Sequence, residues 1–168
     1  EDLDGKTPTN MLLFGTPSKL LDGAQTEDQF YGFLDTGYAR RCLFGYGSID
    51  KRASNTMTPE EIYKNNINPT NSANMNKWAT HFHDLADPAM TGWLMDVDDD
   101  VGIEIVRYRI ACEQAAEKMS DHEEIRKAEL SHRYFKALKL AGAYAFVDKS
   151  LKIEMHHFLS AVLLVEES

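Results

Sequence analysis

The sequence is poor in cysteine and proline and has no long apolar run. Its 2 cysteines, Cys42 and Cys112, lie far apart in a chain of 168 residues, which argues against a disulfide framework and favours a reducing cytoplasm. With 5 prolines and 43% hydrophobic residues, collagen-like and low-complexity classes are excluded and a packed fold is expected. The longest apolar runs, such as residues 141–147, fall far short of the roughly 20 residues of a membrane span, so no membrane contact is expected.

Basic residues are also scarce. Lys and Arg number 18 against 27 Asp and Glu, which gives a formal net charge of -9. Proteins that coat nucleic acid need an excess of cations against the phosphate backbone. Any contact with DNA must therefore come from a local patch or from another part of a larger molecule.

The first fifty residues have the pattern of strand, helix and strand. Residues 10–15 form a continuous apolar run, which is typical of a buried strand. A capping box formed by Thr26 and Gln29 predicts a helix that ends at Gly37. Residues 40–45 then predict a second short strand with two arginines at its start.

The rest of the chain has the apolar spacing of helices. Residues 46–55 are rich in Gly, Ser, Asp and Asn and predict a linker, so we expect one domain over residues 1–50 and a second over 51–168. The fold class is therefore mainly α, with a short α/β fragment followed by a helical bundle. Capping boxes begin at Thr58 and Ser120. The expected helices begin at Thr58, cover residues 75–85, 103–115, 120–147 and 157–166, and leave residues 151–153 extended.

Four segments carry a resemblance to a known family. Residues 12–18 (LLFGTPS) and 37–44 (GYARRCLF) resemble the late half of an oligomeric P-loop ATPase core, as found in phage and plasmid primase-helicases. Residues 136–145 and 153–162 are similar to the helical lid that follows such cores in AAA+ and replicative-helicase proteins. The resemblance implies the end of an ATPase core followed by a lid. It does not cover residues 46–100.

The resemblance also implies site residues near the first segments. In such families a polar sensor residue ends a buried strand, which points to Thr16, and a later arginine finger points to Arg40 or Arg41. A guanidinium from a neighbouring subunit stabilises the charge that develops on the transferred phosphate. Alternatively, the two arginines face water or cap carbonyl groups, and Thr16 is an ordinary turn residue before proline.

A second pair of candidates lies on the lid-like helix. Arg133 and Lys136 are one helical turn apart and would reach nucleotide phosphates from above, as the family's second sensor does. The alternative is a pair of surface charges at i,i+3 spacing.

A complete phosphate-binding loop is missing. Residues 5–7 (Gly-Lys-Thr) match only the last letters of its pattern, and Pro8 follows where a helix should begin. The resemblance therefore implies the C-terminal part of a longer helicase, with ATP and Mg bound mainly by residues outside this chain. It further implies a homo-oligomeric ring in the cytoplasm, that of the host if the protein is phage-encoded. Single-stranded DNA would be touched through the full-length protein, with Lys51 and Arg52 as candidates.

The competing hypothesis is a non-catalytic helical module that binds a replication or regulatory partner through its amphipathic faces. It predicts that changes of the two arginines are silent and that changes in an exposed apolar patch break binding.

No metal site is predicted. Residues 81–84 and 156–157 contain histidines, but neither group has a second half at zinc-site spacing. Residues 96–100 imitate the start of a calcium loop, yet Val101 stands where glycine is needed and Arg107 at the twelfth position. We expect a solvated acidic turn at a helix N-terminus there.

Overall fold

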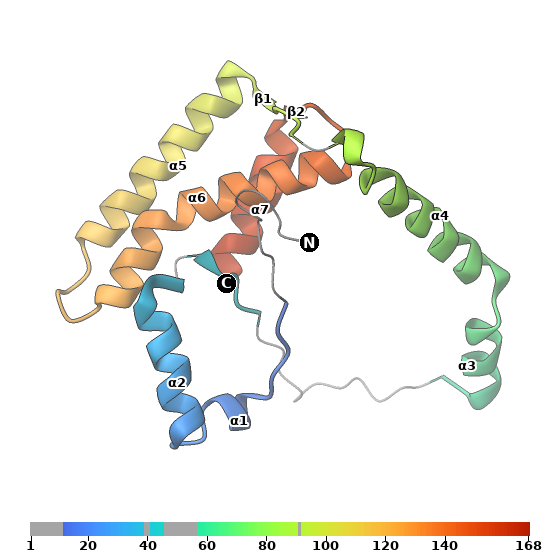
Figure 1. Ribbon diagram of the computed structural model, residues 1–168, viewed down its shortest axis with the longest axis horizontal. Helices are drawn as coiled ribbons and strands as arrows, with labels where there is room; N and C mark the ends of the chain where they lie inside the picture. Colours follow the sequence, from blue (N-terminus) through green and yellow to red (C-terminus); the bar gives the residue numbers. More distant parts are fainter. Residues whose placement is uncertain (1–11, 39–40, 46–56, 91) are drawn as a thin grey trace, which may run out of the picture. The chain divides into compact units, whose positions relative to one another are not determined.

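The computed structural model describes residues 12–38, 41–45, 57–90 and 92–168, and this part of the chain is mainly helical, as expected (Figure 1). The chain divides into two compact units, Glu1–Ala39 and Arg40–Ser168. The predicted linker at residues 46–55 lies outside the described residues. The elements are α1 (Pro17–Leu20), α2 (Gln25–Phe33), the π-helical turn η1 (Leu34–Tyr38), α3 (Pro59–Asn66), α4 (Pro69–Leu85), the 3-10 turn η3 (Pro88–Met90), β1 (Asp96–Val97), α5 (Asp99–Glu117), α6 (Glu124–Val147), β2 (Lys152–Ile153) and α7 (Met155–Glu167).

The first unit is built from α1, α2 and η1. The predicted helix is present, but it begins at Gln25, and Thr26 does not cap it. Instead, the backbone N–H of Gly23 donates to Glu27 Oε2 over 2.7 Å, so an acidic side chain in the first turn satisfies the incoming backbone. Gly37 has a φ of 86° and ends the helical run, as predicted, because this conformation suits glycine.

Both strands predicted near the start of the chain are wrong over their described residues. Residues 12–16 and 41–45 contain no strand; residues 10–11 and 40 lie outside the described part. Leu12, Leu13 and Phe14 are 79%, 74% and 90% exposed, although their pattern predicts burial. A buried strand needs neighbouring strands for its N–H and C=O groups. Among the described residues the only strands, β1 and β2, pair with each other.

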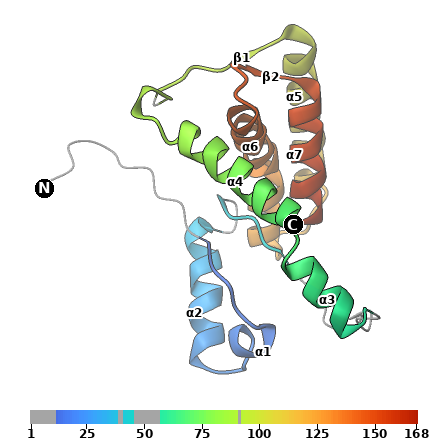
Figure 2. The ribbon, with the colours of Figure 1, turned by 90° about the vertical axis from the view of Figure 1, so that its right-hand side faces the viewer.

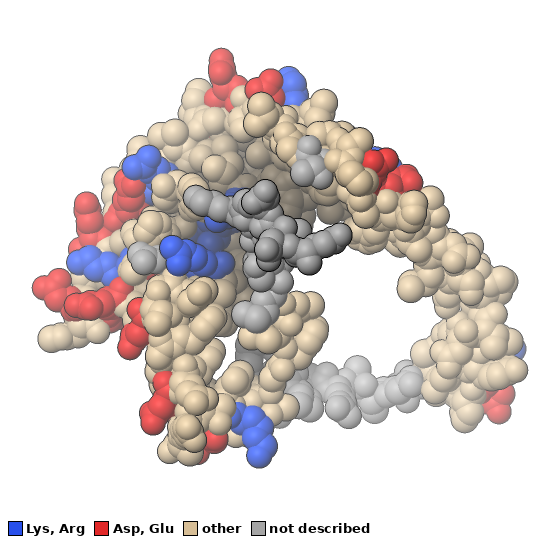
Figure 3. Space-filling model, in the orientation of Figure 1, with Lys and Arg blue, Asp and Glu red and all other residues tan. Residues whose placement is uncertain are grey.

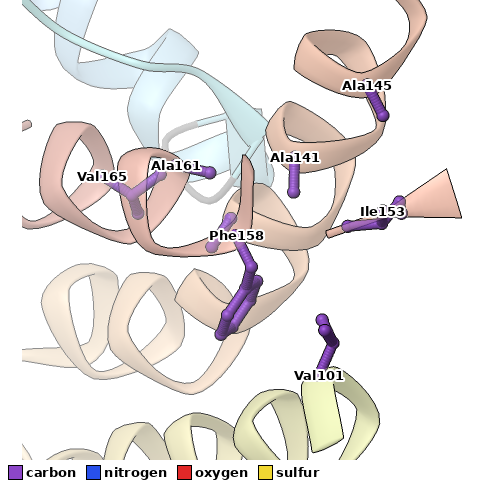
Figure 4. Packing of buried hydrophobic residues seen from close by; sticks show 8 residues of the cluster. Val101, Ala141, Ala145, Ile153, Phe158, Ala161 and Val165 are labelled. Carbon is purple, nitrogen blue, oxygen red and sulfur yellow. The ribbon is translucent and has the colours of Figure 1, made fainter. Parts of the chain in front are cut away.

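The second unit contains the hydrophobic core, where α5, α6 and α7 pack together (Figures 1 and 2). Helix α6 presents a stripe of alanines spaced four residues apart, all fully buried, and their small size lets α7 approach closely. Phe158 of α7 is the largest fully buried side chain, and its ring lies 6.1 Å from that of Tyr108. The buried cluster, most of which Figure 4 labels, consists of Val101, Ala137, Ala141, Ala145, Ile153, Phe158, Ala161 and Val165.

A short parallel strand pair joins the starts of α5 and α7. Asp96 pairs with Lys152 and Val97 with Ile153, which confirms the extended segment predicted at residues 151–153. Lys152 Nζ lies 2.7 Å from Asp98 Oδ1. The acidic residues after β1 fill the first turn of α5, the helix N-terminus at which we expected them.

Of the three predicted helix caps, that of Thr26 is not formed, as described above, one of the other two is formed and the other is not. The capping box of Thr58 and Glu61 is confirmed: Glu61 N–H donates to Thr58 Oγ1 over 3.3 Å, and Thr58 N–H donates to Glu61 Oε2 over 2.8 Å. The box predicted at Ser120 is wrong, because the Ser120 hydroxyl bonds the Glu123 carboxylate and α6 begins only at Glu124. The predicted end at Val147 is confirmed.

Helix α4 is attached to the end of α6 by polar contacts. His81 Nε2 donates to the carbonyl oxygen of Val147 over 2.6 Å, and Lys149 Nζ lies 2.9 Å from Asp84 Oδ2. The surface of α4 carries few charged side chains (Figure 3). None of the helices in the described segments combines the length and the apolar character that crossing a bilayer requires.

Candidate functional site

The segment of residues 41–45 is held against the helical bundle by two hydrogen bonds. Lys136 Nζ donates to the carbonyl oxygen of Cys42 over 3.2 Å, and the backbone N–H of Phe44 donates to Ser168 Oγ over 2.7 Å. Lys136 is only 8% exposed, so its ammonium group is a buried anchor on α6. These contacts place the start of the segment, and with it Arg41, beside α6.

A pocket of about 580 Å³ lies between this segment and α6. Its charged lining residues are all basic, and the remainder are aromatic or aliphatic apart from one histidine. The lining consists of Arg41, Leu43, His132, Tyr134, Phe135, Lys136, Lys139, Leu140 and Ala143. The sequence as a whole is acidic, so this is the local basic patch that an anionic ligand requires.

Among the residues that the structure describes, two of the pocket's cations have no carboxylate partner. Arg41 is exposed and has no hydrogen bond or ion pair with any residue that the structure describes. Lys139 is also exposed, and its Nζ lies 5.1 Å from the ring centroid of Phe135 in a cation–π contact, with no carboxylate of the described segments paired to it. Both groups are available to an incoming anion.

Lys136 belongs instead to an ion-pair network that links α5, α6 and α7. Glu129 accepts from Lys136 Nζ over 2.7 Å and from both Arg133 Nη2, over 2.7 Å, and Arg133 Nε, over 3.2 Å. Arg133 also donates to Glu166 Oε2 over 3.1 Å, and the Tyr108 hydroxyl donates to Glu166 Oε1 over 2.5 Å. Each helix therefore contributes to one connected polar cluster.

The network shifts the ionisation of its members. Burial opposes the charge on Glu129, but hydrogen bonds and the charges of Arg133 and Lys136 outweigh it and lower the pKa of Glu129. The hydrogen bond to Glu129 raises the pKa of Arg133 further. Burial, with help from Glu166, raises the pKa of Tyr108, so its hydroxyl stays a donor. These pKa shifts keep Glu129 and Arg133 charged and the Tyr108 hydroxyl protonated at neutral pH.

The structure brings some predicted site residues together. Arg41 and Lys136 line one pocket, and Arg133 and Lys136 share Glu129. Thr16 belongs to the other unit, where its carbonyl oxygen accepts from the first turn of α1 and its side chain caps nothing. Arg40 lies outside the described residues. The phosphate-binding roles of Arg133 and Lys136 stay predictions, and the structure gives both side chains an intramolecular role.

The sequence reasoning missed the acidic partners and the aromatic part of the pocket. Glu129 stands four residues before Arg133 and seven before Lys136, a spacing that places all three on one helix face and signals pairing. Glu166 has no such signal, because its contact with Arg133 joins two helices. Phe135 and Lys139, also four residues apart, were detectable as a cation–π pair.

A second group of polar side chains lies where α6 gives way to α7. The ligand-type atoms of Asp148, His156 and His157 lie within 4.8 Å of one another. However, His157 Nδ1 accepts the backbone N–H of Glu154 over 3.0 Å, so the ring proton is on Nε2, which donates to Asp148 Oδ2 over 3.0 Å. A metal at Nε2 would need a fully deprotonated imidazole, so this arrangement fits a helix cap better than a metal site.

No family model matches the sequence, and comparisons with curated proteins and with solved structures likewise found no match.

Proposed function

We propose that this chain is the C-terminal segment of a replicative ATPase of the primase-helicase type, in which it supplies a lid and a trans-acting arginine finger. The observation that carries the proposal is the state of Arg41. Within the described residues, its guanidinium is exposed and unpaired, and none of those that line the pocket beside it is acidic. A guanidinium in this state can approach a phosphate of another subunit without first breaking an ion pair.

The proposed division of roles follows from the contacts. Arg41 is the finger, and the buried Lys136 positions its segment through the carbonyl group of Cys42. Arg133 holds the helices of the lid together through Glu129 and Glu166. ATP and Mg are bound mainly by a phosphate-binding core outside this chain. Assembly into a ring completes the nucleotide sites, and single-stranded DNA is moved by the full-length protein.

The test measures ATP hydrolysis after this chain is mixed with, or fused to, a core that carries a complete phosphate-binding loop. Arginine fingers contribute about 10³-fold or more to the rate of hydrolysis. We therefore expect Arg41→Ala to lower kcat about a thousandfold or more, with unchanged helical circular dichroism. Arg126→Ala is the matched control, because Arg126 is an exposed arginine of α6 whose one ion pair in the described part of the chain is with Glu123 at 3.4 Å. Equal rates of ATP hydrolysis for the two variants would show that Arg41 is not an arginine finger.

A second function is favoured by one surface feature. Met75, Trp78 and Phe82 are 71%, 53% and 53% exposed and follow each other at three- and four-residue spacing on α4. Exposed tryptophan on an apolar stripe is typical of binding hot spots, so α4 fits a helical interaction module. Under this alternative Trp78→Ala weakens binding of a replication partner, and Arg41→Ala changes nothing.

A further inference from the structure

We propose that the pocket between residues 41–45 and α6 binds one nucleotide unit, with the phosphate against Arg41 and Lys139 and the base against Phe135. This goes beyond the proposed function, and it requires Arg41 to hold this ligand and to reach a neighbour's triphosphate at different times. A finger acts on a triphosphate that another subunit holds, whereas this pocket is formed by one chain and binds its ligand without a neighbour.

The pocket has the size and lining of a small-ligand site. Its volume of about 580 Å³ lies within the range of about 300–1,000 Å³ that is usual for such sites. Leu43 comes from the segment, and Leu140 and Ala143 come from α6, so an apolar surface is present on both sides. A ligand with a flat aromatic part can bury that part here.

The charges select an anion. Arg41 and Lys139 have no carboxylate partner in the described residues, and no acidic residue lines the pocket. Lys136 also lines it, but its charge is compensated by Glu129 at 2.7 Å. The positive charge available to a ligand therefore belongs to Arg41 and Lys139, and a phosphate matches the donor geometry of both.

The aromatic group stands next to this charge. Phe135 is 47% exposed, which leaves much of its ring in contact with water. Lys139 Nζ lies 5.1 Å from the ring centroid, so a base stacked on Phe135 brings its attached phosphate within reach of the ammonium group. Aromatic side chains interleaved with cations are the usual platform for nucleotide units, since every base has a flat face.

The same chemistry occurs in a free mononucleotide and in a nucleotide of a single strand. Both offer a phosphate beside a base, and both fit the pocket as described. The experiment therefore includes one probe of each kind, and a third probe, inorganic pyrophosphate, that has charge without a base.

The experiment is isothermal titration calorimetry on the chain itself with AMP, a short oligothymidylate and pyrophosphate. We expect AMP or the oligothymidylate to bind in a one-to-one ratio. Phe135→Leu should weaken that binding about tenfold, since stacking on an aromatic side chain contributes roughly 1–3 kcal/mol per base, and should leave pyrophosphate unaffected. Lys139→Gln should weaken all bound probes about fivefold and reduce their salt dependence.

Lys77→Gln is the matched control, because Lys77 is an exposed lysine of α4 outside the pocket. Tighter binding of the oligothymidylate than of AMP would identify a strand as the natural source, and equal binding a free nucleotide. Absence of binding by both, or equal affinities for wild type, Phe135→Leu and Lys139→Gln, would overturn the proposal. Neither of these two results tests the proposed role of Arg41 as an arginine finger. That role is tested by ATP hydrolysis in the presence of a core with a phosphate-binding loop.

Discussion

Lys136 carries a buried positive charge with two partners, the carboxylate of Glu129 and the carbonyl oxygen of Cys42. A buried ion pair adds little net stability compared with apolar packing, but removing one partner leaves the other charge uncompensated. If the charge of Lys136 is removed, Glu129 still pairs with Arg133, and the loss of stability is therefore smaller.

We predict that Lys136→Met lowers the free energy of unfolding by about 2–3 kcal/mol, which would be visible as a lower urea midpoint. Lys152→Met is the control, since Lys152 forms an ion pair in which both side chains are 53% exposed, and we expect no measurable change there. If both variants unfold at the same midpoint, the network does not stabilise the bundle.

The lowered pKa of Glu129 predicts how the stability of the fold changes at acid pH. Its pKa is lower in the folded protein, so its contribution to stability is complete above the pKa of the unfolded chain, about 4.3. The contribution is lost as the pH falls through the folded pKa, because the proton neutralises the carboxylate. We therefore expect the difference in unfolding free energy between wild type and Glu129→Gln to be largest at neutral pH and to shrink below about pH 4. Urea titrations at several pH values measure this difference in unfolding free energy. A difference that does not vary with pH would contradict the prediction.

At the scale of elements, the packing of α7 on α6 depends on one large side chain against a row of small ones. Phe158 is 1% exposed and packs with alanines of α6 that are fully buried. Phe158→Ala should lower the free energy of unfolding by about 3–5 kcal/mol, since it opens a cavity in the core. Leu163→Ala on the same helix should change it by less than about 0.5 kcal/mol, because Leu163 is 68% exposed. Thermal unfolding followed by circular dichroism distinguishes the two.

Local signals predicted elements well where the contacts that form them are local. The capping box at Thr58 and the helix end at Val147 depend on neighbouring residues, and both are confirmed. The strand prediction at residues 12–15 failed because an apolar run indicates only that its side chains favour burial. A strand also needs a neighbouring strand for its backbone hydrogen bonds. Ser120 failed because its hydroxyl bonded a side chain instead of the backbone.

At the scale of the molecule, the candidate site could be predicted only in part. Arg41 and Lys136 were both singled out from the sequence, but nothing in the sequence shows that they line one pocket, since a contact between distant segments arises from tertiary packing. The same limit applies to Glu166, which the fold brings to Arg133. Residue type and helical spacing predicted candidate site residues. Only the fold shows which of these charged side chains have an ion-pair partner among the described residues.

The division into two units predicts independent folding of the larger one. Every residue of the buried cluster lies between Val101 and Val165. A chain that begins at Arg40 should therefore unfold cooperatively, with a urea midpoint close to that of the full chain. Loss of a cooperative transition on removal of residues 1–39 would show that the core needs them.

The pairing of β1 with β2 has a consequence for the order in which the chain folds. All of α5 and α6 lies between the two strands, so they can meet only after the helical hairpin has turned back on itself. We expect the hairpin to form early, from contacts near in sequence, and the strand pair to close late. Ile153→Val should then accelerate unfolding in stopped-flow measurements and leave the refolding rate unchanged.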